Sequence, residues 1–207
     1  MFEDHVHMEK SLYAGLVPEI MSTYYEETGY NDPENQDHAD ALWDSIDFDA
    51  GIVALSDDYA KEKNLPIAQR FPWDLTKGIY LLNGHHHLHC LKSIHNTILE
   101  YRRGVPQSRP VAHVSHCLDA LRRQVICDAD DTPRASTREF SPNTGVGQSR
   151  QCRSWERLES WAADHTACYK YVDPQNTTMS NLERFKFCPE GSPYWDVIRE
   201  VYPHAGE

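Results

Sequence analysis

Two short stretches decide how this chain is interpreted: HHLHCL at His86–Leu91 and HVSHCL at His113–Leu118. Both follow the pattern H-x-x-H-C-L, and the second copy begins 27 positions after the first. The likeness extends beyond the pattern, because apolar residues stand four and eight positions after the Cys in each copy. The chain therefore contains an internal duplication rather than two unrelated pairs of His residues.

Each copy lies in a segment with the periodicity of an α-helix. Successive residues of a helix turn by about 100°, so the second His of each copy lies about 60° from the first, and the Cys lies about 40° from it on the other side. The apolar positions centre near about 110°, which places both imidazoles at one edge of an apolar face. We expect the two helices to pack by these apolar faces, which are formed by Leu91, Ile94 and Ile98 and by Leu118, Leu121 and Val125.

Packing of that kind brings four imidazoles together at the seam between the helices. Neutral imidazole is a good ligand for Cu, Zn, Fe and Ni and a poor one for Mg or Ca. A lone His pair on a helix is usually an ordinary surface or core feature, and it is the duplication that favours a metal site. The predicted ligands are His86, His89, His113 and His116.

Other His residues extend the set of candidate ligands: His85, His87, His95 and His165. On the helical wheel His85 falls near His89 and stays eligible as an additional ligand. His87 falls inside the apolar face, so we expect it to be buried and packed rather than to bind metal.

Several metals and chemistries are compatible with paired His motifs. Zinc held by two His from each helix gives a closed structural site, whereas hydrolytic zinc needs an open position and a general base. The sequence has no H-E-x-x-H, no G-x-S-x-G and no phosphate-binding loop. A pair of copper ions, each held by imidazoles from one helix and activating dioxygen between them, fits the twofold pattern. The expected cofactor is therefore copper, as one or two ions. The alternative is a non-catalytic partner subunit stabilised by zinc or disulfides.

Six Cys residues accompany the His motifs. Cys90 and Cys117 hold equivalent positions and either act as soft ligands or cross-link the helices. We favour a disulfide between them, because a free thiol beside redox-active copper is soon oxidised. Cys127 lies about 15 Å along the helix from Cys117, so those two do not pair. The preferred remaining pairs are Cys127 with Cys152 and Cys168 with Cys188, although six Cys allow other connectivities.

The rest of the sequence predicts a mainly α-helical single domain built around these two helices, with long irregular segments. Residues 1–36 form an irregular N-terminal arm, residues 37–168 the metal-binding core, and residues 169–207 a C-terminal extension. The periodicity and the capping residues predict helices at Asp37–Ser45, after the cap Ser56, at Gly84–Arg103, from Pro110 to Asp128 and at Cys152–Ala163, with a strand at Gly78–Leu82. The polar stretch Asp131–Ser149 is predicted to be a loop.

Composition limits the classes of function. The chain has 207 residues, with 20 Lys and Arg against 32 Asp and Glu, which gives a formal net charge of -12. Such a surface repels phosphate backbones and anionic lipid, so nucleic acid is not an expected partner. Small molecules, metals and peptides remain. An even number of Cys and the glycosylation acceptor at Asn176 agree with a secretory compartment.

From Ala39 to Trp161 the sequence resembles the UstYa-like family of fungal proteins. The paired H-x-x-H-C motifs carry the resemblance, together with Cys127, Ala129, Asp130 and Thr132 as C-x-A-D-x-T and Gln151, Cys152, Arg153 and Trp155 as Q-C-R-x-W. The resemblance implies an oxidative tailoring enzyme of secondary-metabolite pathways, with copper as the metal and a peptide or other small molecule as substrate. The outcomes that it implies are oxidative cyclisation, hydroxylation, desaturation and halogenation.

Location, assembly and supporting residues complete the expectations. Members of the family usually carry an N-terminal transmembrane helix, and its absence here suggests a soluble variant or a trimmed chain. From the Cys residues and the glycosylation acceptor we expect a protein of the secretory lumen or a secreted one. A homo- or hetero-oligomer with a related chain is a further expectation. Asp119 and Asp130 are candidates to orient ligand imidazoles. Alternatively, Asp130 ends the second long helix and Asp119 pairs with a nearby Arg.

Overall fold

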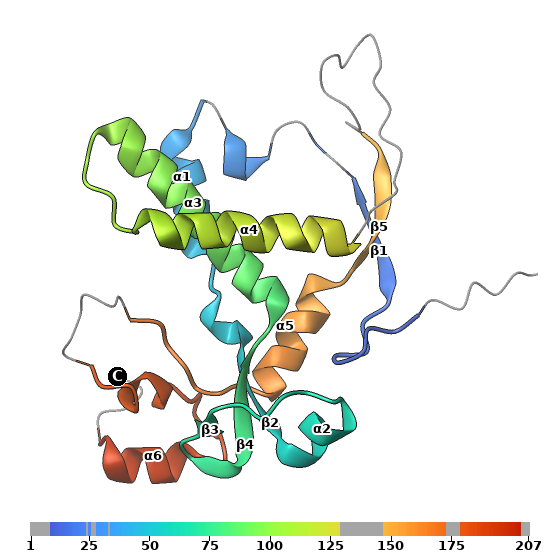
Figure 1. Cartoon of the computed structure of the whole chain (residues 1–207), viewed down its shortest axis with the longest axis vertical. Helices are drawn as coiled ribbons and strands as arrows, with labels where there is room; N and C mark the ends of the chain where they lie inside the picture. Colours follow the sequence, from blue (N-terminus) through green and yellow to red (C-terminus); the bar gives the residue numbers. More distant parts are fainter. Residues whose placement is uncertain are drawn as a thin grey trace, which may run out of the picture. The chain divides into compact units, whose positions relative to one another are not determined.

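The computed structural model describes residues 9–23, 25, 28–32, 34–128, 147–172 and 179–203. The chain divides into two compact units, whose elements are labelled in Figure 1. The first unit contains Met1–Ser11, Gly15–Ile46 and His87–Ser154, and the second contains Leu12–Ala14, Asp47–His86 and Trp155–Glu207. The organisation as one domain with an arm, a core and an extension stays a prediction.

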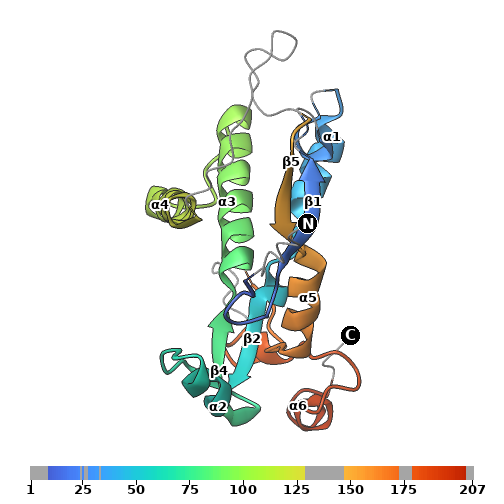
Figure 2. The same ribbon diagram turned by 90° about the vertical axis from the view of Figure 1, so that its right-hand side faces the viewer.

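The first unit combines a small sheet with helices. Strand β1 (Pro18–Thr23) pairs antiparallel with β5 (Ser149–Arg153), with Met21 opposite Gln151. The helices are α1 (Gln36–Ser45), α4 (Val111–Asp128), most of α3 (Asn83–Arg103) and the short 3-10 helix η1 (Gly29–Asn31). Figure 2 shows α4 end-on beside α3 and β1 alongside β5.

Side chains hold α1 against α3. The Nη2 of Arg103 donates to Oδ2 of Asp40 at 2.8 Å. The indole of Trp43 stacks on the ring of His95, with 4.6 Å between ring centroids. The Nζ of Lys92 donates to carbonyl oxygens at the end of α1. These contacts order the part of α3 that follows the first His motif.

The connection from α3 to α4 follows the expected chemistry. Helix α3 ends before Gly104, whose φ of 66° lies in the left-handed region that glycine adopts without strain. Helix α4 begins directly after Pro110, which has no N–H to leave unsatisfied in a first turn. The backbone N–H of His113 donates to the carbonyl of Pro110 at 2.9 Å. Both long helices are therefore confirmed close to their predicted bounds.

The second unit contains a three-stranded antiparallel sheet in the order β2-β4-β3. The strands are β2 (Ile52–Ser56), β3 (Arg70–Phe71) and β4 (Asp74–Leu81). Val53, Ala54 and Leu55 in β2 are all buried, because hydrophobic clusters cover both faces of that strand. This strand is the centre of the core of the second unit.

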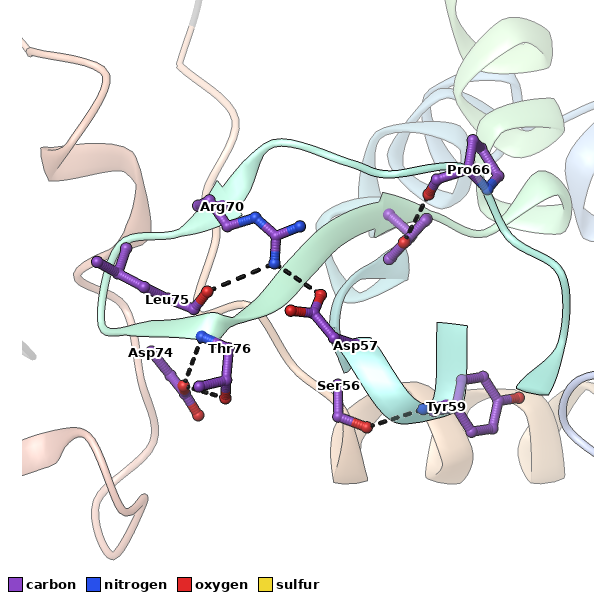
Figure 3. A network of polar contacts seen from close by, with 9 residues as sticks. Ser56, Asp57, Tyr59, Pro66, Arg70, Asp74, Leu75 and Thr76 are labelled. Atoms are coloured by element: carbon purple, nitrogen blue, oxygen red, sulfur yellow. Dashed lines mark hydrogen bonds and ion pairs between the residues drawn. The ribbon is translucent and has the colours of Figure 1, made fainter. Parts of the chain in front are cut away.

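Helices and a disulfide surround this sheet. Helix α2 (Asp57–Glu62) is capped by Ser56, whose Oγ accepts the N–H of Tyr59, and Arg70 donates to Asp57 across the turn (Figure 3). The remaining elements are η2 (Asp49–Gly51), α5 (Trp155–Asp164), η3 (Glu183–Phe185) and α6 (Trp195–Val201). A disulfide joins Cys168 to Cys188 within the hydrophobic core, so this predicted pair is confirmed.

The prediction of a mainly α fold is wrong. Helices hold 49% of the described residues and strands hold 16%, in two small antiparallel sheets, so the fold is mixed α/β. The arm expected to be irregular contains β1, and Cys152 lies in β5 rather than in the following helix. Short strands leave no periodic pattern of the kind that predicts a helix. Their backbone N–H and C=O groups are satisfied by pairing with a strand that is distant in the sequence.

The predicted packing of α3 on α4 is also wrong. Leu91 and Ile98 on α3 are 39% and 52% exposed, and Leu118 and Val125 on α4 are 55% and 72% exposed. Where α4 meets α3, the fully buried residues are instead Cys90 and Cys117. The helices therefore meet about 70° around the wheel from the expected apolar faces.

In the described part of the chain, no helix is both long and apolar enough to cross a membrane.

Candidate metal centre

The centre of the duplicated motif is the point where α4 crosses α3 in the first unit (Figure 2). Cys90 on α3 and Cys117 on α4 have no exposed surface, and their side chains hydrogen bond to each other. Burial, followed by the hydrogen bond and charge of Cys117, raises the pKa of Cys90 to about 12. Cys90 is therefore a neutral thiol near pH 7, and the small side chains let the helices approach closely.

Two of the four predicted ligands lie side by side at this crossing. The ring centroids of His89 on α3 and His113 on α4 are 5.5 Å apart, and the rings are inclined by 79°. With metal–nitrogen bonds of about 2 Å, two imidazoles on one ion have centroids roughly 5 Å apart. The observed spacing is close to that value, so the pair fits a shared transition-metal ion.

The surroundings of His113 support this fit. Its Nε2 is buried and has no hydrogen-bond partner among the described residues. Burial lowers the pKa of His113 below its usual 6.5, and the positive charges of Arg109 and His116 lower it further. His113 is therefore neutral near pH 7 and keeps a nitrogen lone pair that is not used within the protein, as a metal ligand must.

The other two predicted ligands lie one helical turn away from this pair along their own helices. His116 is exposed on α4, one turn after His113, and His86 is half-buried on α3, where its backbone N–H donates to the carbonyl of Leu82. Over the described residues, no three His, Cys, Asp or Glu side chains are grouped so that they could hold a metal ion. The structure thus brings together His89 and His113, and it does not gather the full set of four.

The whole chain was compared with known proteins. The family model described as "Mycotoxin biosynthesis protein UstYa" matches residues 14–165, which include both motifs. The chain belongs to the UstYa family. Among relatives in this family, "Chlorinase cctP2" of Talaromyces islandicus is 37% identical over 202 residues, which cover 91% of this chain and 63% of the relative. No solved structure matches the chain.

Two further UstYa relatives carry names of oxidative enzymes. "Hydroxylase cctR" of Talaromyces islandicus is 33% identical over 161 residues, or 74% of this chain and 60% of the relative. "Oxidase ustYa" of Aspergillus flavus is 26% identical over 122 residues, or 56% of this chain and 53% of the relative. The chain spans about three fifths of the length of the first two curated relatives. The family resemblance drawn from the paired motifs is confirmed.

His85, the additional candidate ligand, lies in a different environment in the second unit. It is fully buried, and neither ring nitrogen has a hydrogen-bond partner in the described structure. Its ring lies 4.9 Å from that of Trp155, and its Cβ packs against Gly51. Burial lowers the pKa of His85, opposed by the charges of Glu159 and Asp47. This imidazole is packed rather than paired with another His in that unit.

The other candidate ligands from the sequence, His87, His95 and His165, make contacts of their own. Burial lowers the pKa of His87, against the charge of Asp128, which agrees with the expected packed position. His95 stacks on Trp43, as described above, and the Nδ1 of His165 lies 2.7 Å from the carbonyl of Trp161. The last two rings are therefore engaged within their own local packing.

The predicted supporting residues and Cys pairs have mixed outcomes. Asp119 accepts two hydrogen bonds from Arg122, at 2.9 and 2.7 Å, and this contact lowers the pKa of Asp119. The alternative role, pairing with an Arg, is thus the one seen. Cys127 is exposed on α4, and the structure has no disulfide between it and Cys152. Cys90 and Cys117 are likewise thiols in the structure, so the disulfide favoured between them from the sequence is not seen there. Asp130 and Asn176 lie outside the described residues.

Sequence reasoning missed a cavity of about 500 Å³ between α1 and α3 in the first unit. Asp37, Asp40 and Asp44 line one wall, and Glu100 and Arg103 line the other. The spacing of three and four residues on each helix is the signal that could have revealed two converging polar faces. The surplus of carboxylates favours cationic over anionic groups in this cavity.

Proposed function

We propose that this chain is a copper-dependent oxidative tailoring enzyme. It uses dioxygen to functionalise a C–H, O–H or N–H bond of a peptide or other secondary metabolite. The single observation that carries the proposal is the contact of His89 with His113, one imidazole from each copy of the motif. The names of the relatives, which include a chlorinase, a hydroxylase and oxidases, support an oxidative activity.

In this proposal His89 and His113 hold copper, with His116 and His86 as the further ligands of the motif. Bound copper supplies one-electron redox chemistry and activation of dioxygen. The chain itself keeps His113 neutral near pH 7 through desolvation, and the Nε2 of this ring has no hydrogen-bond partner among the described residues. The buried contact of Cys90 with Cys117 lies close to the two rings, because Cys90 directly follows His89 and Cys117 lies one helical turn after His113.

Copper titration of the purified protein, followed by paramagnetic resonance, tests the proposal. Loss of a ligand exceeds the tenfold to hundredfold cost of losing a supporting residue, so His89→Ala and His113→Ala should each weaken copper binding by about 100-fold or more. His38→Ala, at an exposed His of α1, is the matched control and should bind as the wild type does. Unchanged binding by both site variants would contradict the proposal.

A second candidate is a partner subunit whose site is stabilised by zinc and completed by a related chain. The observation that favours it is the lack of a third metal-binding side chain beside His89 and His113 among the described residues. Metal analysis that finds one zinc per chain and no copper, with activity only after a homologous chain is added, would favour this candidate. Activity of the purified chain alone with copper would exclude it.

We also propose a secretory location. The disulfide between Cys168 and Cys188 supports it, because such bonds persist in oxidising compartments.

A further inference from the structure

Two thiols that the proposed chemistry does not use meet beside the imidazole pair. Cys90 directly follows His89, and Cys117 lies one helical turn after His113. Both thiols are fully buried and hydrogen bond to each other. We call Cys90 and Cys117 the thiol pair.

The thiol pair is the centre of a narrow contact. Leu91 and Leu118, the apolar residues next to the two Cys, are 39% and 55% exposed, so they add little buried surface between the helices. A hydrogen bond between thiols is weak. The relative position of His89 and His113 therefore depends on a contact that contributes little free energy unless it becomes covalent.

We propose that Cys90 and Cys117 form a disulfide during folding and that this bond positions His89 and His113 for metal. The positioning half of this inference rests on the proposed function, and the disulfide half does not. In the described structure the thiols do not join the imidazoles in a group of three metal-binding side chains. They lie beside the His pair, where a cross-link suits them better than ligation.

The chemistry is thiol–disulfide exchange. The two Cys thiols lose two protons and two electrons and form one S–S bond, while a small-molecule or protein disulfide is reduced to two thiols. The exchange must precede full burial, because an oxidant does not reach thiols that have no exposed surface. The same chain already holds Cys168 and Cys188 as a buried disulfide, so conditions that oxidise that pair also supply the oxidant here.

Peptide mapping of the native protein decides the disulfide half. The protein is purified without reductant, alkylated in denaturant, digested and analysed by mass spectrometry before and after reduction. We expect a peptide that links Cys90 to Cys117, together with the Cys168–Cys188 peptide as the internal control. Recovery of Cys90 and Cys117 as alkylated thiols from protein whose Cys168–Cys188 bond is intact would overturn the inference.

Variants decide the positioning half. The double variant Cys90→Ser with Cys117→Ser keeps side chains of similar size, and Cys127→Ser on the same helix is the matched control. We expect the double variant to bind copper about tenfold more weakly and to give a changed paramagnetic resonance spectrum, while Cys127→Ser matches the wild type. A double variant with wild-type affinity and spectrum would refute the positioning role.

The two failures are distinguishable. If the wild type binds no copper, the proposed function and the positioning half fail together, whereas the mapped peptides still decide the disulfide. If the Ser double variant does not fold, Cys90→Ala with Cys117→Ala replaces it, because alanine puts no hydroxyl group into the buried site and Cys168–Cys188 is kept. Wild-type copper affinity of the Ala double variant would then overturn the positioning role.

Discussion

Two imidazoles with buried ring nitrogens that lack hydrogen-bond partners in the described structure occupy different surroundings: half-buried His113 at the crossing of α3 and α4, and fully buried His85 in the second unit. The ring of His113 has another imidazole, that of His89, at 5.5 Å. The ring of His85 has the indole of Trp155 at 4.9 Å and the backbone of Gly51 against its Cβ. Desolvation is the main cause that lowers the pKa of both side chains.

This difference teaches that burial and a missing partner do not by themselves identify a metal ligand. What separates the two residues is the neighbour. A second imidazole offers another lone pair at ligand spacing, whereas an indole and a glycine offer only packing. The comparison predicts that changes around His85 alter folding stability and that changes around His113 alter metal binding.

The largest expected effect on stability comes from Gly51. A Cβ at this position would lie 2.3 Å from Cβ and Cγ of His85, atoms that cannot move away without moving α3. Gly51→Ala should lower the free energy of unfolding by at least about 2 kcal/mol, as overpacked cores do. Urea unfolding of Gly51→Ala and of the wild type measures this loss.

The double variant Gly51→Ala with His85→Gly is the control for that clash, because glycine removes both the Cβ and the imidazole of residue 85. Compared with His85→Gly alone, the added Gly51→Ala should cost less than half of its effect in the wild type, giving a coupling energy of about 1 kcal/mol or more. Additive effects of the two substitutions would show that Gly51 and His85 do not limit each other.

A smaller effect is expected from His85→Leu. This change removes two buried nitrogens without partners, each of which costs about 1–3 kcal/mol, but it also loses the ring contact with Trp155. We expect the free energy of unfolding, measured with urea, to rise by about 1 kcal/mol and the copper affinity to stay unchanged. A loss of copper affinity as large as that of His113→Ala would instead make His85 a ligand.

The pH dependence of stability sharpens the same point. Burial lowers the pKa of His85, so the unfolded chain binds a proton there that the folded chain does not. The contribution of neutral His85 to the free energy of unfolding is fully present above the unfolded-state pKa, near 6.5. It is lost as the pH falls through the lowered pKa of the folded state. The free energy of unfolding should therefore fall from pH 7 to pH 5.

In His85→Leu the free energy of unfolding should fall less steeply between pH 7 and pH 5 than in the wild type. Some slope should remain, because His87 and His113 also have lowered pKa values. Urea unfolding at pH 7, 6 and 5 on both proteins measures the two slopes. Parallel slopes would mean that His85 takes up its proton equally in the folded and unfolded chain.

The helices were predictable because their ends carry local chemistry. Ser56 caps α2, Pro110 precedes α4 and Gly104 follows α3, and each of these residues acts through its own backbone or through one nearby N–H. The sheets were not, although the apolar run Ile52–Leu55 was a visible strand signal. Strands β1 and β5 are largely exposed, and their pairing joins residues from 126 positions apart (Thr23 with Ser149) to 135 positions apart (Pro18 with Arg153), so no local pattern marks it.

The candidate site was predictable as a set of residues but not as a geometry. The duplicated motif identified His89 and His113, and it also identified Cys90 and Cys117 as equivalent positions. Helical periodicity then favoured the apolar stripes as the contact. The structure uses the two Cys instead, because small side chains permit a close crossing that bulky Leu residues would prevent.

The smallest expected effect tests that crossing directly. Leu118 is 55% exposed, so Leu118→Ala should change the free energy of unfolding by less than about 0.5 kcal/mol, as surface substitutions do. If the helices packed by their apolar stripes, the same change would cost about 2–5 kcal/mol. Urea unfolding of Leu118→Ala beside Leu121→Ala, whose side chain is half-buried, separates the two arrangements. A large loss of stability in Leu118→Ala would indicate that α4 packs on α3 by its apolar stripe. In that arrangement Cys117 would lie away from Cys90.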